Sequence, residues 1–214
     1  MADIVETLMA IPGAVAVARA RREDAIGLEM PGKEPPYLVY YRGDLDTTEL
    51  DKLELEGDVI RRDLETVERR VAEASEGTFE IDAMDGWLAG MPTYVLVGEL
   101  ASCEVVAGEV QRPDFPPALR EGAARRWRDM AARVLEVAES RAARADVAGC
   151  AGMLAKATIA IAQARLTERG EWVLGEAGIV RRAGLGRTEA ILAATGDRPL
   201  DLERAVTRMR VALR

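Results

Sequence analysis

The stretch that decides the fold is PPALREGAARRWRDMAARVLEVAESRAARADVAGCAGMLAKATIAIAQARLT, residues 116–167. Pro116 and Pro117 are typical of a helix start, because the N–H that proline lacks would have no partner there anyway. The apolar spacing that follows predicts a long amphipathic helix to about Ala143, and Asp146 is a good N-cap for a second helix to about Thr167. Since the connection between them is short, the two helices should pack antiparallel.

The rest of the chain divides around this helix pair. Shorter helices are predicted after it, at 172–183, 187–194 and 200–213, so the C-terminal half should be an all-α bundle. Breakers and short apolar runs before it predict a sheet with helices. We therefore expect an α+β fold, a small mixed-sheet domain over residues 1–112 followed by an antiparallel helical bundle over residues 113–214.

Within the N-terminal half, strands are predicted at 14–18 and 37–41, with a weaker one at 58–60. Asp63 is a good N-cap for a helix carrying Leu64, Val67 and Val71 at helical spacing. Further helices are expected at 3–9, from 46 or 47 to 53, and from Pro92 or Thr93 through Val105.

Composition excludes several classes of function. The formal charge of −8 argues against a nucleic-acid binder, which needs a basic footprint to offset phosphates. The chain has no histidine, which excludes imidazole acid/base chemistry, histidine-containing triads and most zinc sites. Cys103 and Cys150 lack metal-ligand spacing and are expected to be free thiols in a reducing cytosol. No apolar run approaches the roughly 20 residues that span a membrane, so we expect a cytoplasmic protein with no membrane partner.

A second set of residues carries a family resemblance. The stretch ARADVAGCAGMLAKATIAIAQARLTERGEWVLGEAG, residues 143–178, resembles the helical domain of the nucleotidyltransferase superfamily that includes kanamycin nucleotidyltransferase. It is most similar to bacterial nucleotidyltransferase-domain proteins of unassigned substrate, and the resemblance extends upstream over most of the chain. The residues that fall in the family register without a gap are Asp146, Gln163, Trp172, Glu176 and Gly178.

The resemblance implies three chemical parts in the N-terminal sheet. A Gly-Ser turn after the first strand offers N–H groups and a hydroxyl to the nucleotide phosphates. An Asp-x-Asp pair on the next strand holds Mg²⁺. A third carboxylate on a neighbouring strand completes the metal site and can act as base.

This chain departs from that pattern at the residues that handle the nucleotide. Residues 19–22, Arg-Ala-Arg-Arg, stand where the Gly-Ser turn should be, and residues 34–36, Glu-Pro-Pro, stand where the Asp-x-Asp pair should be. Ala177 and Gly175 replace a family lysine and asparagine, and only the third carboxylate survives, as Asp58. We therefore expect that transfer activity has been lost and that neither a metal nor a nucleotide cofactor is bound.

Two local motifs invite another interpretation. Asp44-Leu45-Asp46 is itself an Asp-x-Asp sequence, and with Asp58 it would form a rebuilt metal site, although a loop and a helix cap explain it more simply. Residues 184–187, Gly-Leu-Gly-Arg, fit a helix C-cap and turn better than a phosphate loop, because no strand precedes them.

The cleft between sheet and bundle is where the resemblance places the second substrate, and interdomain clefts commonly bind ligands. Lys156 is unusual within an apolar run and should either snorkel or pair with a carboxylate, for which Glu176 is the natural candidate. The aromatic candidates could equally be core residues, Glu99 a solvated helix residue, and the carboxylates of the 80–85 segment an inert open loop. The resemblance gives Asp58, Glu99, Lys156 and Glu176 as catalytic candidates, and Tyr40, Asp82, Asp85, Trp87 and Tyr94 as substrate-binding candidates.

Three hypotheses follow. The favoured one is a repurposed protein that binds or transforms a small molecule in the cleft, by metal-independent acid/base chemistry if it is an enzyme. The second is an active nucleotidyltransferase with the rebuilt metal site. The third is a regulatory protein whose bundle mediates assembly, and a homodimer is one form this could take.

Overall fold

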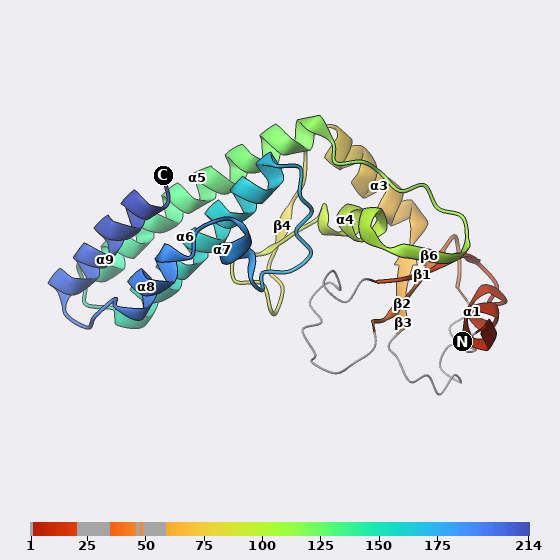
Figure 1. Cartoon of the computed structure of the whole chain (residues 1–214), viewed down its shortest axis with the longest axis horizontal. Coiled ribbons are helices and arrows are strands. Elements are labelled where there is room, and N and C mark those ends of the chain that lie inside the picture. The colour runs from red at the N-terminus through yellow and green to blue at the C-terminus, as the bar shows by residue number, and fades with distance from the viewer. Residues whose placement is uncertain (1, 21–34, 46–47, 49–58) are drawn as a thin grey trace.

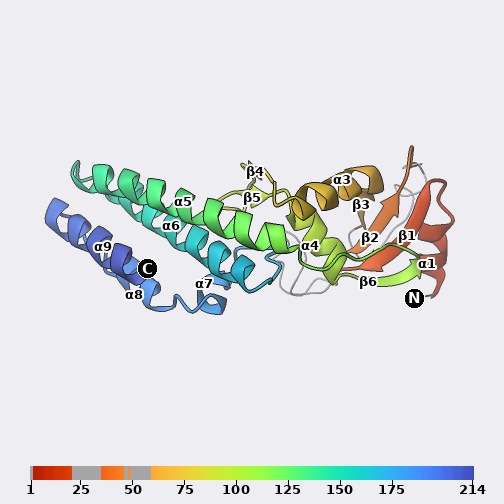
Figure 2. The ribbon, with the colours of Figure 1, turned by 90° about the horizontal axis from the view of Figure 1, so that it is seen from above.

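The computed structural model describes residues 2–20, 35–45, 48 and 59–214. The molecule is elongated, with the sheet near one end of its long axis and the helical bundle at the other (Figures 1 and 2). Helices α3 (Leu64–Ser75) and α4 (Val95–Ser102) lie between the two. The α+β architecture with a helical C-terminal part is thus confirmed.

The larger sheet is mixed, with strand order β3-β2-β1-β6. Strand β1 pairs antiparallel with both β2 and β6, whereas β2 and β3 are parallel. The three predicted strands are confirmed as β1 (Ala14–Arg19), β2 (Tyr37–Tyr41) and β3 (Val59–Asp63).

The fourth strand, β6 (Glu104–Gly108), corrects the sequence analysis, which extended the helix of this region through Val105. Helix α4 ends at Ser102 because Cys103 turns extended, with φ −65° and ψ 156°. The residues that follow alternate between exposed and half-buried positions, which is the period of a strand at a sheet edge. Pairing with β1 therefore overrode the helical pattern.

Side chains alternate across the sheet and bury both faces. One face carries Val17 and Val39, which pack with Leu8 of α1 (Ala2–Met9) and with Ile11. The other face carries Leu38 and Tyr40 and is covered by Leu64, Val67 and Leu100 of α3 and α4. Asp63 caps α3 as predicted, accepting hydrogen bonds from the backbone N–H groups of Glu65 and Thr66.

The bundle is built on the long helices α5 (Pro117–Ala142) and α6 (Val147–Glu168), and the structure, which describes every residue from 117 onward, contains no strand there. Asp146 caps α6 as predicted, accepting a 2.9 Å hydrogen bond from the N–H of Gly149. The predicted helix at 172–183 is wrong over most of its length, because Gly178, with φ +66°, starts only a short α7 (Ile179–Arg182). Helices α8 (Arg187–Ala193) and α9 (Pro199–Ala212) complete the bundle.

A short hairpin of β4 (Ile81–Asp82) and β5 (Met91–Pro92) connects α3 to α4. Its flanking residues Phe79 and Tyr94 belong to the same buried cluster as Leu119 and Trp127 of α5. The largest core of the molecule therefore crosses residue 112, and the division at that point stays a prediction.

One described helix, α6, is long and apolar enough to cross a membrane by length and composition. Our expectation that the sequence held no such stretch was therefore too strict. Half of the apolar window is buried inside the molecule, and Leu154, Ala157 and Leu166 of this helix belong to the bundle core. Core helices commonly have this character.

Candidate functional site

Glu99 lies on α4 and is buried, with 2% of its side chain exposed. Arg62 of β3 pairs with it through two hydrogen bonds, from Nε to Oε1 at 2.5 Å and from Nη2 to Oε2 at 2.8 Å. This two-point contact between planar groups is a strong form of ion pair. Glu99 is therefore not a solvated helix residue, and its contact with Arg62 ties α4 to the sheet.

Arg62 is less enclosed than its partner, with 19% of its side chain exposed. A guanidinium carries five N–H donors, and Glu99 engages only the Nε and Nη2 groups. In the part of the chain that the structure describes, no other acceptor bonds Arg62. Among the described residues, Arg62 is thus a partly buried cation with N–H donors that Glu99 does not engage.

Tyr40 is the Cα partner of Arg62 in the parallel β2–β3 register. Its ring is fully buried, and its hydroxyl donates to Cys103 Sγ at 3.8 Å. Burial, together with the nearby Cys103 and Glu99, raises the pKa of Tyr40 above its usual value, and burial also raises the pKa of the Cys103 thiol. Both groups therefore stay neutral near pH 7, and the contacts of Tyr40 are those of a core residue.

Tyr94 is also buried, at 1% exposure, inside the bundle core. Its hydroxyl accepts a 2.9 Å hydrogen bond from Trp127 Nε1 and donates to Gln163 Oε1 at 3.5 Å. Burial raises the pKa of Tyr94, so its hydroxyl stays protonated. Gln163 Nε2 is buried without a hydrogen-bond partner among the described residues.

Trp87 packs against Val95 of α4 and against Leu174, with 7% of its surface exposed. Val95 and Glu99 are four residues apart, so they lie on the same face of α4. Gly98, between them, allows the 172–174 segment to approach closely, because a Cβ there would lie 2.8 Å from Leu174 Cδ2. This face of α4 therefore joins the ion pair at the sheet to the tryptophan at the bundle.

Glu176 holds the hairpin against the bundle. Its two carboxylate oxygens accept hydrogen bonds from the backbone N–H groups of Leu88, at 2.6 Å, and Ala89, at 2.8 Å. Burial raises the pKa of Glu176, and these two N–H groups and the charge of Lys156 lower it. The effect of burial is the largest, so the pKa of Glu176 lies above its usual value.

Lys156 is half-buried on α6 and lies near enough to Glu176 to act on its pKa. The two residues form no ion pair, however, and Lys156 forms none with any other carboxylate that the structure describes. The predicted direct pairing of Lys156 with Glu176 is therefore wrong. Backbone N–H groups of the hairpin occupy the oxygens that the lysine was expected to bind.

The hairpin's own carboxylates face solvent. Asp82 and Asp85 are exposed, and Glu80 pairs with Arg126 of α5 at 3.2 Å. Arg126 also donates to the carbonyl of Phe79 and lies 4.7 Å from the centre of its ring. The crowded acidic segment is thus part of a solvent-exposed hairpin, with Asp82 in strand β4, rather than an open loop.

The structure brings the candidates together in two groups. Tyr40 and Glu99 meet at the sheet, and Trp87, Lys156 and Glu176 lie around the hairpin. Asp46 and Asp58 lie outside the described residues, and those that are described contain no group of three or more histidine, cysteine or acidic residues able to hold a metal ion.

Sequence reasoning missed Arg62, the partner of Glu99. In the structure, the parallel register of β2 and β3 places Arg62 beside Tyr40. The missing information was the pairing of β2 with β3, which a single sequence does not give.

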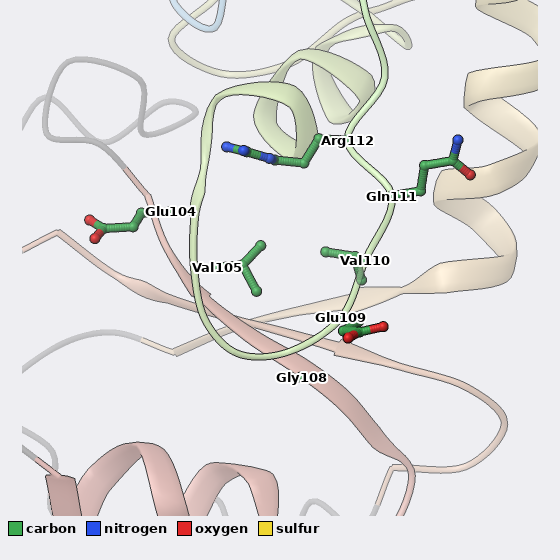
Figure 3. Close-up of a pocket in the computed structure, with 7 residues that line it drawn as sticks. All are labelled: Glu104, Val105, Gly108, Glu109, Val110, Gln111 and Arg112. Atoms are coloured by element: carbon green, nitrogen blue, oxygen red, sulfur yellow. The ribbon is translucent and has the colours of Figure 1, made fainter.

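Two hollows border the connector that leads from β6 towards α5. The smaller hollow, of about 310 Å³, lies between the connector, α3 and the C-terminal end of α4. The wider hollow, of about 680 Å³, lies between the connector and β6 itself, where Val105 and Val110 face each other (Figure 3). Glu109, Val110 and Gln111 line both hollows.

In comparisons with known proteins, no protein-family model, no curated protein and no solved structure matches this chain.

Proposed function

We propose that this chain is a nucleotidyltransferase-like protein that has been repurposed to bind a small molecule, without nucleotide or metal, where the sheet meets the bundle. The α+β architecture and the residues that fall in the family register support this proposal. The face of α4 supports it further. Glu99 on this face pairs with Arg62 of the sheet, and Val95, one helical turn away, packs on Trp87 and Leu174.

Arg62 is the observation that carries the proposal. Buried ion pairs contribute little net stability, and apolar replacements of similar volume are often neutral or stabilising. A pair whose arginine is partly exposed and keeps donors that no described residue engages is therefore better explained by recognition than by stability. Because Glu99 already neutralises Arg62, we expect the ligand to be recognised through an acceptor oxygen rather than through a full negative charge.

Lys156, Asp58 and Glu176 have different roles in this proposal. Lys156 supplies a second half-buried donor, and Asp58 stays a predicted contact outside the described residues. Glu176 is the predicted catalytic carboxylate whose pKa is raised, which suits acid/base chemistry without a metal. Both of its oxygens already hold the hairpin, so we assign it first to positioning that segment.

The test is a double variant, Arg62→Met with Glu99→Met, compared with the wild type in a thermal-shift screen of small metabolites. Removing one partner alone would leave a buried charge and cost about 3–5 kcal/mol, whereas replacing both keeps the fold. We expect ligands that stabilise the wild type to lose their effect on the double variant, whose circular dichroism should be unchanged. The proposal fails if the double variant responds to the same ligands as the wild type.

Nucleotide titrations separate this proposal from the rebuilt-metal alternative, which depends on Asp44, Asp46 and Asp58. Calorimetry with ATP, GTP, CTP and UTP in the presence of Mg²⁺ should show weak binding or none, because the phosphate turn and the family lysine are replaced. Micromolar, Mg²⁺-dependent binding of any of them would put the alternative first. If no small molecule binds at all, the regulatory or interaction role, including a homodimer, becomes the leading explanation.

A further inference from the structure

The smaller hollow is a site of a different kind from the α4 face. Its floor is apolar and is assembled from several elements: Val15 of β1, Leu64 and Val71 of α3, Leu100 of α4, and Val110 of the connector. Its volume is about 310 Å³, and an apolar cavity of roughly 150 Å³ is enough to take up benzene. The floor therefore has room for a single ring with a short substituent.

The walls of this hollow are held in place by the connector's geometry. Gly108 adopts φ +72°, and a Cβ there would collide with the carbonyl oxygen of Val15, so the chain can leave β6 at this point only with glycine. Arg112 donates to the carbonyl of Cys103 at 3.4 Å, which ties the connector back to the start of β6. Gln111 lines both hollows, and in Figure 3 its side chain points towards α3.

Three charged residues lie at the rim, Arg42, Glu68 and Glu109, and one negative charge among them is not balanced. Arg42 and Glu68 form a two-point ion pair with each other, so their charges cancel. Glu109 lines the hollow and forms no ion pair with any residue that the structure describes. The remaining polar residue, Gln111, is neutral. A hollow with an apolar floor and one uncompensated carboxylate is complementary to a cation with an apolar body.

We propose that the smaller hollow binds a small organic cation, with its apolar body on the floor formed by α3, α4 and β1 and its ammonium group facing Glu109. This site is independent of the α4 face, because its lining includes neither Arg62 nor Glu99. The α4 face is proposed to bind an acceptor oxygen, whereas this second site binds a cation, next to the connector that joins the sheet to the bundle.

The experiment is an NMR titration of the full chain with three probes of similar shape: 2-phenylethylammonium, 2-phenylethanol and 3-phenylpropionate. We expect the ammonium compound to shift the backbone amides of Leu64, Val71 and Leu100, and the alcohol and the carboxylate to bind more weakly. Glu109→Gln should weaken binding of the ammonium compound about tenfold, the size expected for loss of one charge-assisted contact.

Glu104→Gln is the matched control, because Glu104 is an exposed glutamate that lines only the wider hollow. It should leave binding unchanged, whereas Val71→Phe, which fills the smaller hollow, should abolish it. The proposal is overturned if the alcohol binds as tightly as the ammonium compound, if Glu109→Gln has no effect, or if Glu104→Gln weakens binding equally. The Arg62→Met/Glu99→Met variant should bind the cation like the wild type, so failure at one site is distinguishable from failure at the other.

Discussion

At the scale of single residues, the polar groups inside this molecule mostly serve to attach one element to another. Glu99 attaches α4 to β3 through Arg62, and Glu176 attaches the β4–β5 hairpin to the bundle. The two carboxylates differ in their partners, because Glu99 meets a full positive charge whereas Glu176 meets two backbone N–H groups. For Glu176, burial outweighs the groups that favour the charged form, so that its pKa rises.

This rise predicts a pH dependence that Glu176→Gln should remove. Burial raises the pKa of Glu176 above its usual value, so the folded state binds the proton more tightly than the unfolded state does. The free energy of unfolding should therefore be larger when Glu176 is protonated. It should fall as the pH rises from about 4 through the folded-state pKa. Urea denaturation across about pH 4 to 7 measures this.

The variant should be less stable at every pH, because glutamine accepts only one of the two hairpin N–H groups well, but its profile should lack this fall. Glu121→Gln, at an exposed position of α5, controls for the loss of one carboxylate. If Glu176→Gln and the wild type lose stability in parallel over this range, the assignment is wrong.

At the scale of elements, α4 links the sheet to the bundle beside α3, which itself contacts both β3 and α5. One face carries Glu99, paired with the sheet, and Val95, packed on Trp87 and Leu174. Gly98 sets the distance to the 172–174 segment, because a Cβ there would lie 2.8 Å from Leu174 Cδ2 and 3.1 Å from Trp172 Cε3. A side chain at this position requires the side chains of Leu174 and Trp172 to shift.

We expect Gly98→Ala to destabilise the protein by about 1–3 kcal/mol, the usual cost of overpacking a well-filled interface. The matched control is Gly152→Ala on α6, where an added Cβ would meet no atom within 4 Å. That change should stabilise the protein by about 0.5–1 kcal/mol, because alanine is the better helix former. Chemical denaturation measures the change in the free energy of unfolding for both variants. The prediction requires a decrease for Gly98→Ala and an increase for Gly152→Ala.

At the scale of the whole molecule, the core does not divide where the chain changes character. Phe79, Tyr94 and Val97, which precede residue 112, lie in one buried cluster with Leu119 and Trp127 of the bundle. Elements that share a core are expected to unfold together. The change in secondary structure near residue 112 therefore does not coincide with a break in this cluster.

The prediction at this scale is a single cooperative unfolding transition. Near-ultraviolet circular dichroism of the tryptophans and far-ultraviolet circular dichroism of the helices should give coincident midpoints in urea. Expressed alone, residues 113–214 should be far less stable than the same helices in the full chain, because they lose the contacts of Phe79 and Tyr94. Two separate transitions would show instead that the sheet and the bundle fold independently.

The sequence by itself determined the elements with strong local signals. Helix caps at Asp63 and Asp146, the proline start of α5 and the tyrosine-rich run of β2 are short-range features, and each appears where it was expected. The strand form of β6, in contrast, depends on pairing with β1, which only the folded chain provides. Tertiary structure also decided the partners of the charged candidates: Glu99 found Arg62 rather than solvent, and Glu176 found backbone N–H groups rather than Lys156. The physical reason is that caps and periodicity act within a few residues, whereas burial and ion pairing depend on segments that meet only after the chain has folded.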